Sequence, residues 1–173
     1  AATAQSGDGP PAQLSPRLSS GVEVDLLPYL LGGAYGSIWG ARGRWRARAV
    51  VTRTTLPGFM VDEGFRDHTL RAYTALVDYF PDPRLRGWWL GAGLEYWKNR
   101  VSREDGSATA RWNTPIGTMG GGYVKPVWRR MYINPWAAAH LALDGASSID
   151  VGGAPYRIRR LTSEASLKIG WTF

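Results

Sequence analysis

The sequence predicts an all-β fold, an eight-stranded antiparallel up-and-down transmembrane β-barrel. Three observations lead to this fold: apolar and polar residues alternate along several segments, glycine (22) and tryptophan (9) are both abundant among 173 residues, and the last segment alternates up to a terminal aromatic, Phe173. A period of two describes a strand with one apolar and one polar face. Every strand of a transmembrane barrel needs this pattern, because apolar side chains face lipid and small or polar ones face the lumen.

Composition excludes several other classes of protein. The chain has no cysteine, so it has no disulfide framework and no thiolate chemistry. Mean hydropathy is slightly negative, and no segment approaches the roughly 18 apolar residues of a membrane-spanning helix. The net charge of +7 is carried almost entirely by arginines that form no continuous run, so we expect no nucleic-acid partner.

Residues 1–21 are predicted to form a flexible leader, because they are rich in Ser, Pro, Gly, Ala and Gln and contain few large apolar groups. The start Ala1-Ala2-Thr3-Ala4 suits the mature end left by cleavage of a signal peptide. The barrel domain is expected over residues 22–173.

The first four strands are predicted at 22–30, 34–41, 44–56 and 69–80. Pro28 interrupts the first, and a proline in a strand requires an edge, a bulge or an end position. The third alternates clearly, with Arg46 and Arg48 opposite an apolar face. That apolar face consists of Trp45, Ala47, Ala49 and Val51. The fourth is ambiguous, because Asp78 falls on the face that also carries leucines.

The last four strands are predicted at 88–99, 109–124, 131–143 and 156–173. In the fifth, an apolar face begins at Trp88, and Glu95 lies on the opposite face. In the seventh, His140 lies opposite apolar residues. The eighth alternates through to the last residue of the chain, with polar or small residues between its apolar positions.

The connections alternate between short and long. Short ones are predicted near 41–44, 81–87 and 125–130, and long ones at 57–68, 100–108 and 145–155. Outer-membrane barrels have short periplasmic turns and long extracellular loops. With an even number of strands, the pattern predicts a bacterial outer-membrane protein with both termini in the periplasm.

Aromatic residues gather near both predicted ends of the strands, which is typical of the girdles at membrane interfaces. The group near the short turns is Trp39, Trp45, Trp88, Trp89, Trp128 and Trp171. A second group, near the long loops, is Tyr96, Trp97 and Trp112. The alternative is a tryptophan-rich core in a soluble barrel. Arginines in the short turns either meet anionic phospholipid headgroups or simply solvate the turns.

With these features, residues 22–173 resemble the small eight-stranded outer-membrane barrels of Gram-negative bacteria, the general class of OmpA's membrane domain, OmpX and OmpW. The most specific part is the terminal segment, which looks like the signal read by the barrel-assembly machinery. Its signal residues are Leu167, Ile169, Trp171 and Phe173. Gly170 departs from the usual spacing of that signal's glycine. The resemblance implies phospholipid, lipopolysaccharide and the assembly machinery as partners.

Charged residues are expected inside the barrel, where an eight-stranded lumen is just wide enough for side chains to fill it. The predicted lumen network is Arg46, Arg48, Glu95, His140, Glu164 and Lys168, with Asn134 beside it. Because isolated buried ions are costly, we expect Arg46 or Arg48 to approach Glu95, and Lys168 to pair with Glu164, Glu23 or Asp25. The network is either a structural plug or a narrow gated path.

Catalytic and metal sites are not expected. His68 and His140 are the two histidines, and the hydroxyls and acid nearest to His140 in sequence are Ser147, Ser148 and Asp144. We expect no triad, because His140 is predicted to face the lumen. Two dispersed histidines do not have a metal-ligand spacing, and no cofactor is expected. The glycines at 120–122 lack the lysine and helix of a phosphate loop, and are predicted to admit a bulky lumen neighbour such as Trp136.

The function predicted from these features is a non-catalytic, integral outer-membrane protein with a structural or interaction role through its long loops. The apolar residues of the first long loop, Phe59, Met60, Val61 and Phe65, are candidates for contact with a partner protein. A small porin-like channel is the first alternative. A lipid-modifying enzyme is the next, followed by a soluble ligand-binding barrel.

Overall fold

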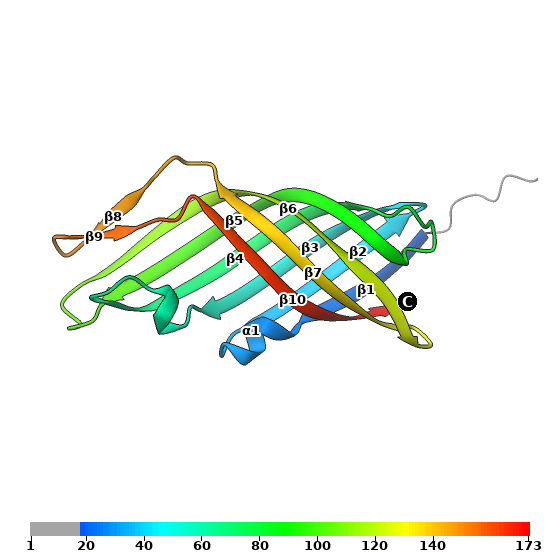
Figure 1. The fold of residues 1–173 in the computed structure, drawn as a ribbon, viewed down its shortest axis with the longest axis horizontal. Helices are drawn as coiled ribbons and strands as arrows, with labels where there is room; N and C mark the ends of the chain where they lie inside the picture. Colours follow the sequence, from blue (N-terminus) through cyan, green and yellow to red (C-terminus); the bar gives the residue numbers. More distant parts are fainter. Residues whose placement is uncertain (1–17) are drawn as a thin grey trace, which may run out of the picture.

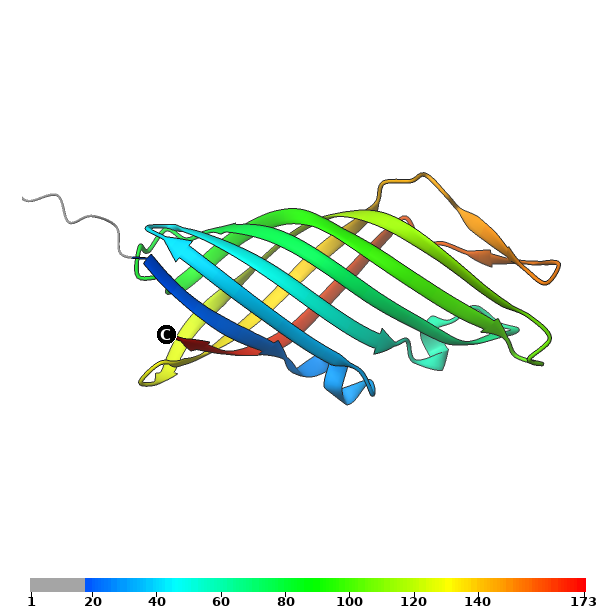
Figure 2. The same ribbon diagram turned by 180° about the vertical axis from the view of Figure 1, so that it is seen from behind.

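A computed structural model describes residues 18–173 of the protein, and in it eight strands close into an antiparallel barrel (Figures 1 and 2). The closed eight-stranded barrel predicted from the sequence is thus confirmed. Around the barrel the order is β1-β10-β7-β6-β5-β4-β3-β2. The barrel strands are β1 (Leu18–Asp25), β2 (Ala34–Arg42), β3 (Trp45–Thr55), β4 (Phe65–Tyr79), β5 (Gly87–Arg103), β6 (Thr109–Trp128), β7 (Met131–Ala142) and β10 (Leu161–Thr172).

The remaining elements all lie in the connections. A short helix, α1 (Leu26–Leu30), follows β1, and a 3-10 turn, η1 (Gly58–Met60), follows β3. The strands β8 (Ser148–Val151) and β9 (Ala154–Arg157) form a separate hairpin between β7 and β10. Within residues 18–173, no helix is both long and apolar enough to cross a membrane.

The first predicted strand, 22–30, is wrong in its second half. β1 ends at Asp25, whose side chain accepts a hydrogen bond from the Leu27 N–H at 3.1 Å and caps α1. Pro28 is the third residue of this helix, where its missing N–H has no intrahelical partner to lose. β1 also begins four residues earlier than predicted, at Leu18, and the predicted leader otherwise lies outside the described residues. The eighth predicted strand, 156–173, begins only at Leu161, because Tyr156 belongs to β9.

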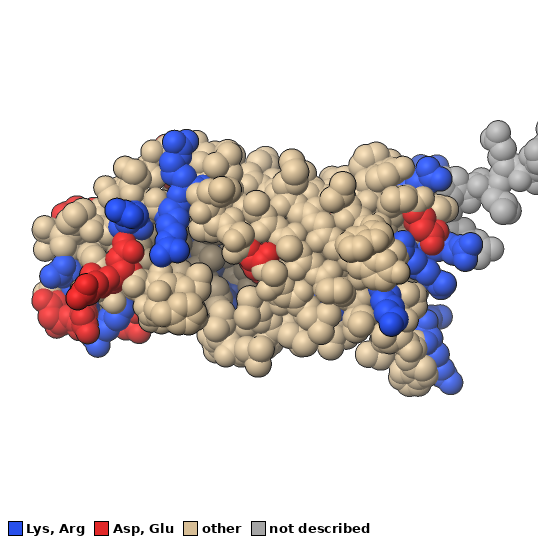
Figure 3. Space-filling model, in the orientation of Figure 1, with Lys and Arg blue, Asp and Glu red and all other residues tan. Residues whose placement is uncertain are grey.

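The barrel buries charge and exposes apolar side chains. Inward positions such as Arg46 and Glu23 are 1 % exposed, whereas Leu90 is 73 % exposed on the outside. Figure 3 shows that Lys, Arg, Asp and Glu gather at the two ends of this face and leave an uncharged band between them, interrupted by one acidic group. This arrangement is the reverse of a soluble barrel, whose apolar faces point inward.

The two ends of the barrel differ. Short turns at 43–44, 80–86 and 129–130 lie at the end where β1 begins and β10 finishes (Figure 1). The opposite end carries the connections 26–33, 56–64, 104–108 and 143–160, and all of these except 104–108 are longer than any of the short turns. The first and last barrel strands therefore start and end together, as an even number of strands requires.

Candidate functional site: a sealed lumen below an open cavity

A cluster of paired charges fills the lumen nearest the short turns. Asp78 accepts hydrogen bonds from Arg46 Nε at 2.8 Å and from Arg48 Nε and Nη2 at 2.7 and 2.9 Å. Glu23 lies 3.1 Å from Arg46 Nη1 and 3.6 Å from Arg48 Nη1. All four side chains are buried, and their two negative and two positive charges cancel. We call these four residues the plug.

Strand register explains the position of the plug. Asp78 on β4 lies directly opposite Arg46 on β3, and two positions separate Arg46 from Arg48 on the same face. On the other side of Asp78 the register partner is Gly91 of β5, where a Cβ atom would overlap the Asp78 carboxylate. The glycine therefore leaves room for the buried carboxylate.

An aromatic cluster seals the lumen beneath the plug. Its buried rings are Trp39, Phe80, Trp89 and Tyr132. The Arg46 guanidinium lies 4.9 Å from the centre of the Phe80 ring, and Arg48 lies 4.9 Å from that of Trp89. Tyr132 accepts a hydrogen bond from Trp39 Nε1 at 2.9 Å and donates one to Glu23 at 3.0 Å. The charges are thus enclosed by rings on the side of the short turns.

Two of the six tryptophans predicted for the girdle lie inside the barrel. Trp39 and Trp89 are 6 % and 2 % exposed, because they occupy the inward phase of β2 and β5. The other four have exposed side chains: Trp45, Trp88, Trp128 and Trp171. Trp136 is the register partner of Gly122 in the glycine run, and Trp89 is a second bulky neighbour, since a Cβ atom at Gly122 would meet the Trp89 indole nitrogen.

The predicted pairing of Glu95 with an arginine is wrong. Glu95 is opposite Thr74 of β4. Thr74 lies four residues from Asp78, about 13 Å along the strand in the direction away from the short turns. Glu95 instead accepts a hydrogen bond from Thr118 Oγ1 at 2.7 Å and lies 3.3 Å from His140 Nδ1. The other ring nitrogen of His140 lies 3.6 Å from Glu164. His140 thus bridges two carboxylates in the upper half of the lumen.

Lys168 lies between these two groups of charges. Its Nζ is 3.5 Å from the centre of the Trp136 ring and 5.5 Å from that of Tyr35. Among residues 18–173, no ion pair joins it to the acids predicted as its partners, Glu164, Glu23 or Asp25. A cation–π contact with a ring face is favourable for a buried ammonium group.

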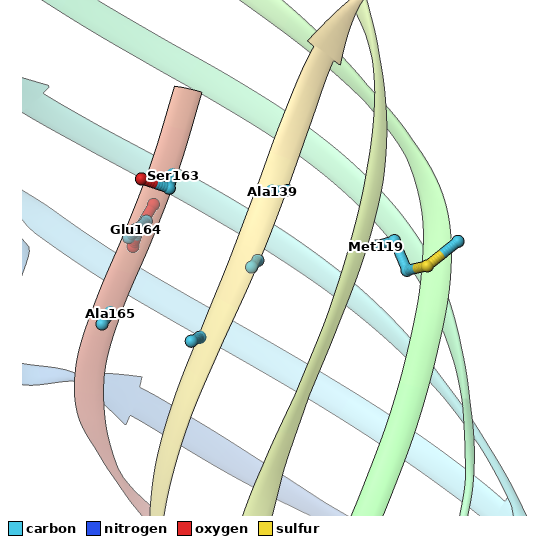
Figure 4. Close-up of a pocket in the computed structure, with 7 residues that line it drawn as sticks. Met119, Ala139, Ser163, Glu164 and Ala165 are labelled. Atoms are coloured by element: carbon cyan, nitrogen blue, oxygen red, sulfur yellow. The ribbon is translucent and has the colours of Figure 1, made fainter. Parts of the chain in front are cut away.

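Above the plug, the lumen widens into a cavity of about 540 Å³. Its apolar lining includes Val50, Leu56, Leu70, Trp112, Ile116 and Trp136. Its polar lining includes Glu95, His140, Glu164 and Lys168. A second, shallow hollow of about 400 Å³ lies on the outer face of β6, β7 and β10, where small residues such as Ala139 and Ala165 leave space (Figure 4). Glu164 lies behind β10 in that view, on the lumen side.

The β8–β9 hairpin covers part of the loop end and is anchored by Tyr156. Tyr156 packs with Val101 and Val151, and its hydroxyl lies 2.8 Å from His68 Nδ1. Burial raises the pKa of Tyr156 to about 12, so its hydroxyl keeps its proton at neutral pH and can donate to an unprotonated His68 Nδ1. The other nitrogen, Nε2, then carries the proton and donates to Asn99 Oδ1 at 3.1 Å.

Acidification is expected to loosen the hairpin. His68 lies beyond the apolar band, and burial lowers the pKa of its imidazole below the ordinary 6.5. The unfolded chain therefore takes up a proton first, and stability falls as the pH drops below about 6.5. Protease sensitivity of residues 143–160 should rise between pH 7.5 and pH 5. His68→Gln, which keeps a neutral polar side chain, should remove most of this pH dependence, and an unchanged pH profile in that variant would contradict the assignment.

The structure does not assemble the catalytic group weighed from the sequence. Among the described residues, His140 makes its polar contacts with Thr118, Glu95 and Glu164, and none with Ser147, Ser148 or Asp144. The Thr118 hydroxyl approaches His140 at 2.9 Å but also donates to Glu95. The part of the chain that the structure describes contains no group of three or more acidic or histidine side chains placed to hold a metal.

The barrel is similar in fold to a solved outer-membrane protein domain. No family model matches this sequence, and no curated protein sequence is similar to it. Among solved structures, the N-terminal β-barrel domain of OprF from Pseudomonas aeruginosa superposes with a TM-score of 0.53 at 11% identity. The superposition covers 92% of this chain and 100% of that domain. At this identity the similarity shows a shared barrel fold.

Proposed function

We propose that this chain is an integral protein of a bacterial outer membrane that neither conducts nor catalyses, and that works through the end carrying its long loops. The membrane location is supported by the outward-facing band of large apolar residues. Its exposed members include Ile38, Val51, Val77, Leu90 and Leu94. Soluble monomers rarely expose a continuous apolar surface of this extent, whereas a transmembrane barrel requires one about 25 Å tall.

Exposed charges support an orientation with the long loops outside the cell and both termini in the periplasm. Arg53, Arg71 and Lys98 are successive register partners on the outer face of β3, β4 and β5, just above the exposed ring of Tyr73. Like charges directly opposite repel, so an anionic partner would stabilise this row. Lipopolysaccharide phosphates supply one at this height. At the opposite end, Trp45, Trp88 and Trp128 and the arginines of the short turns suit phospholipid headgroups.

The plug is the observation that favours a sealed barrel over the porin-like channel. Arg46 and Arg48 each bridge Asp78 and Glu23 across the lumen, and aromatic rings cover them. Ions would pass only if these pairs separated, which would leave buried charges without partners. The loop end, by contrast, has an open cavity and the connections 56–64, 104–108 and 143–160. The predicted loops 57–68 and 100–108 are shorter than expected, because β4 already begins at Phe65 and β5 continues to Arg103. A protein partner is most readily contacted at Phe59, which is 88 % exposed, whereas Phe65 packs against Tyr156.

Conductance across a planar bilayer tests this proposal. The purified protein, inserted as a heat-modifiable barrel, is expected to give no current steps at neutral pH. Deletion of the hairpin, residues 148–157, should leave it silent, because the seal lies at the other end of the lumen. Steady conductance of the unmodified protein that increases in Glu23→Gln would instead establish the gated channel. Loss of hydrolytic activity on a lipid in His140→Ala, with folding intact, would establish the enzyme.

A further inference from the structure

The wall of the barrel has a gap beside β10. β1 and β10 pair only as far as Asp25 and Lys168. Beyond that point the chain leaves the wall as α1, while β10 continues to Leu161 and is paired with β7 alone. β2 is likewise paired only with β3 beyond Ser37. The half of β10 nearer the loops is therefore a free edge, which crosses the front of the barrel in Figure 1.

The free edge presents backbone polar groups to the gap. The Phe173 N–H donates to the Ser20 carbonyl, on the side of β1. The Thr172 N–H donates to the Arg130 carbonyl, on the side of β7. Backbone groups alternate in direction along an antiparallel strand, so those of Ser163, Ala165 and Leu167 face the gap. Open strand edges occur at membrane depth only where they border protein or a hydrated cavity. This edge must therefore face a polar or hydrated space.

The gap leads into the cavity. One rim of the cavity consists of Leu27, Pro28 and Leu31, from α1 and the residue after it. The opposite rim is formed by residues of the free edge, among them Ser163, Glu164 and Ala165. Figure 3 shows the surface hollowed beside β10 at this place. The cavity thus opens sideways as well as toward the loops, within the half of the apolar band that lies nearer the long loops.

Arginines lie at the upper end of the gap. Arg157, Arg159 and Arg160 belong to the segment that leads into β10, and none forms an ion pair with another residue of 18–173. Arg157 and Arg159 also line the cavity, whereas Arg160 does not. Below them the walls include the aliphatic side chains Val50 and Leu70. Asp62, Glu95 and Glu164 also line the cavity, but Arg157 and Arg159 bring positive charge to its upper end. Together with the apolar part of the wall, this charge matches a molecule with an anionic head and an aliphatic tail.

We propose that the cavity binds a single-chain anionic amphiphile, which reaches it from the outer leaflet through the gap between α1 and β10. The head lies on Arg157 and Arg159, whose guanidinium groups pair with carboxylate or phosphate in two-point contacts. The chain lies in the cavity, whose volume falls within the roughly 300–1,000 Å³ of small-molecule sites. This inference rests on the proposed membrane location and adds the ligand class and its route. A fatty acid and a lysophospholipid share this chemistry.

Binding is tested by native mass spectrometry of the purified barrel with palmitate, palmitoyl-lysophosphatidylglycerol or uncharged hexadecanol. One anionic amphiphile per barrel is expected, and its identity shows which source supplies the head. Val50→Trp, which fills the cavity, should lower occupancy about tenfold, while Val51→Trp on the outer face should not. The double variant Arg157→Gln/Arg159→Gln should weaken palmitate about tenfold but leave hexadecanol unchanged, with Arg160→Gln as the matched control.

The route is tested with cysteines at two register partners, Ala165 and Ala137, in a chain that has no cysteine of its own. Both side chains face outward, but Ala165 lies on the free edge and Ala137 lies in paired wall. A bulky maleimide attached after folding to Ala165→Cys should slow palmitate uptake from phosphatidylglycerol vesicles about tenfold, and the adduct on Ala137→Cys should not.

Each contrary outcome has a separate meaning. Equal uptake with both adducts would overturn the side route and leave a cavity filled from the loops. Preference for hexadecanol over palmitate would overturn the anionic head. Absence of binding by all three probes would overturn the whole inference, and the proposed function would still stand if the bilayer remained silent. Only conductance of the unmodified protein would overturn the sealed barrel.

Discussion

Asp78→Asn is expected to destabilise the folded barrel by about 3–5 kcal/mol, because it removes the charge that two buried arginines share. Asp78 accepts three hydrogen bonds of 2.7–2.9 Å from Arg46 and Arg48, and all three side chains are buried. After the substitution, two positive charges face Glu23 alone. Asparagine has nearly the same shape as aspartate, so the loss reports charge rather than packing. The measurement is urea unfolding in detergent micelles, followed by the heat-modifiable band on a gel.

Two further variants separate this explanation from a general intolerance of β4. Asp82→Asn lies in the exposed turn just beyond β4, where the carboxylate is 3.9 Å from Arg84, and it should change stability by about 0.5 kcal/mol or less. Adding Arg48→Met to Asp78→Asn removes the surplus positive charge and should recover part of the lost stability. A double variant as unstable as Asp78→Asn alone would contradict the charge argument.

Deletion of Phe173 is expected to abolish assembly of the barrel in cells while leaving refolding in detergent largely intact. In the folded barrel, Phe173 contributes one backbone hydrogen bond, from its N–H to the Ser20 carbonyl at 2.9 Å, and its ring is exposed. One such bond contributes about 1 kcal/mol, which is too little to decide folding. A large effect in cells therefore reports recognition of the terminal segment by the assembly machinery.

Phe173→Tyr is the matched control, because it keeps an aromatic ring and the backbone bond to Ser20. It should assemble in cells and show the same shift between boiled and unboiled samples as the natural chain. Normal assembly of the deletion variant would contradict recognition of the terminal segment by the assembly machinery. Failure of the deletion variant to refold in detergent would show that Phe173 is needed for the pairing of β1 with β10 itself.

The inward side of the charge network follows from period-two alternation, but its pairing does not. Alternation places Arg46 and Arg48 on one face of β3 and Glu95 on one face of β5, and the structure has all three side chains inside. Alternation does not say at which level along the barrel axis a residue lies relative to residues of other strands, because that level depends on the register between strands. The register places Asp78 opposite Arg46. Asp78, whose face on β4 is ambiguous in the sequence, is therefore the partner of both arginines.

The tryptophans show the same division. Trp88 and Trp89 are neighbours in the sequence and both lie near the short turns, so clustering alone assigned both to a girdle. In the structure they point to opposite sides, and Trp89 donates a hydrogen bond to Asn134 inside the lumen at 2.9 Å. The alternation of residues along β5 places Trp88 and Trp89 on opposite faces, so the sequence is sufficient to separate them. The contact between the Trp89 ring and Arg48 cannot be predicted from the sequence.

The eight strands, their two faces and the contrast between short and long connections are properties of local sequence, because backbone geometry imposes a period of two on any half-exposed strand. The plug, the cavity above it and the gap beside β10 arise only when the eight strands close into a barrel. They depend on which residues meet across a lumen and on where one short strand stops pairing with its neighbour. Asp25 shows this most directly: it caps α1, accepts a hydrogen bond from Trp136 Nε1 at 2.7 Å, and stands where the wall opens. The contact with Trp136 joins residues 111 positions apart, a separation over which local patterns carry no signal.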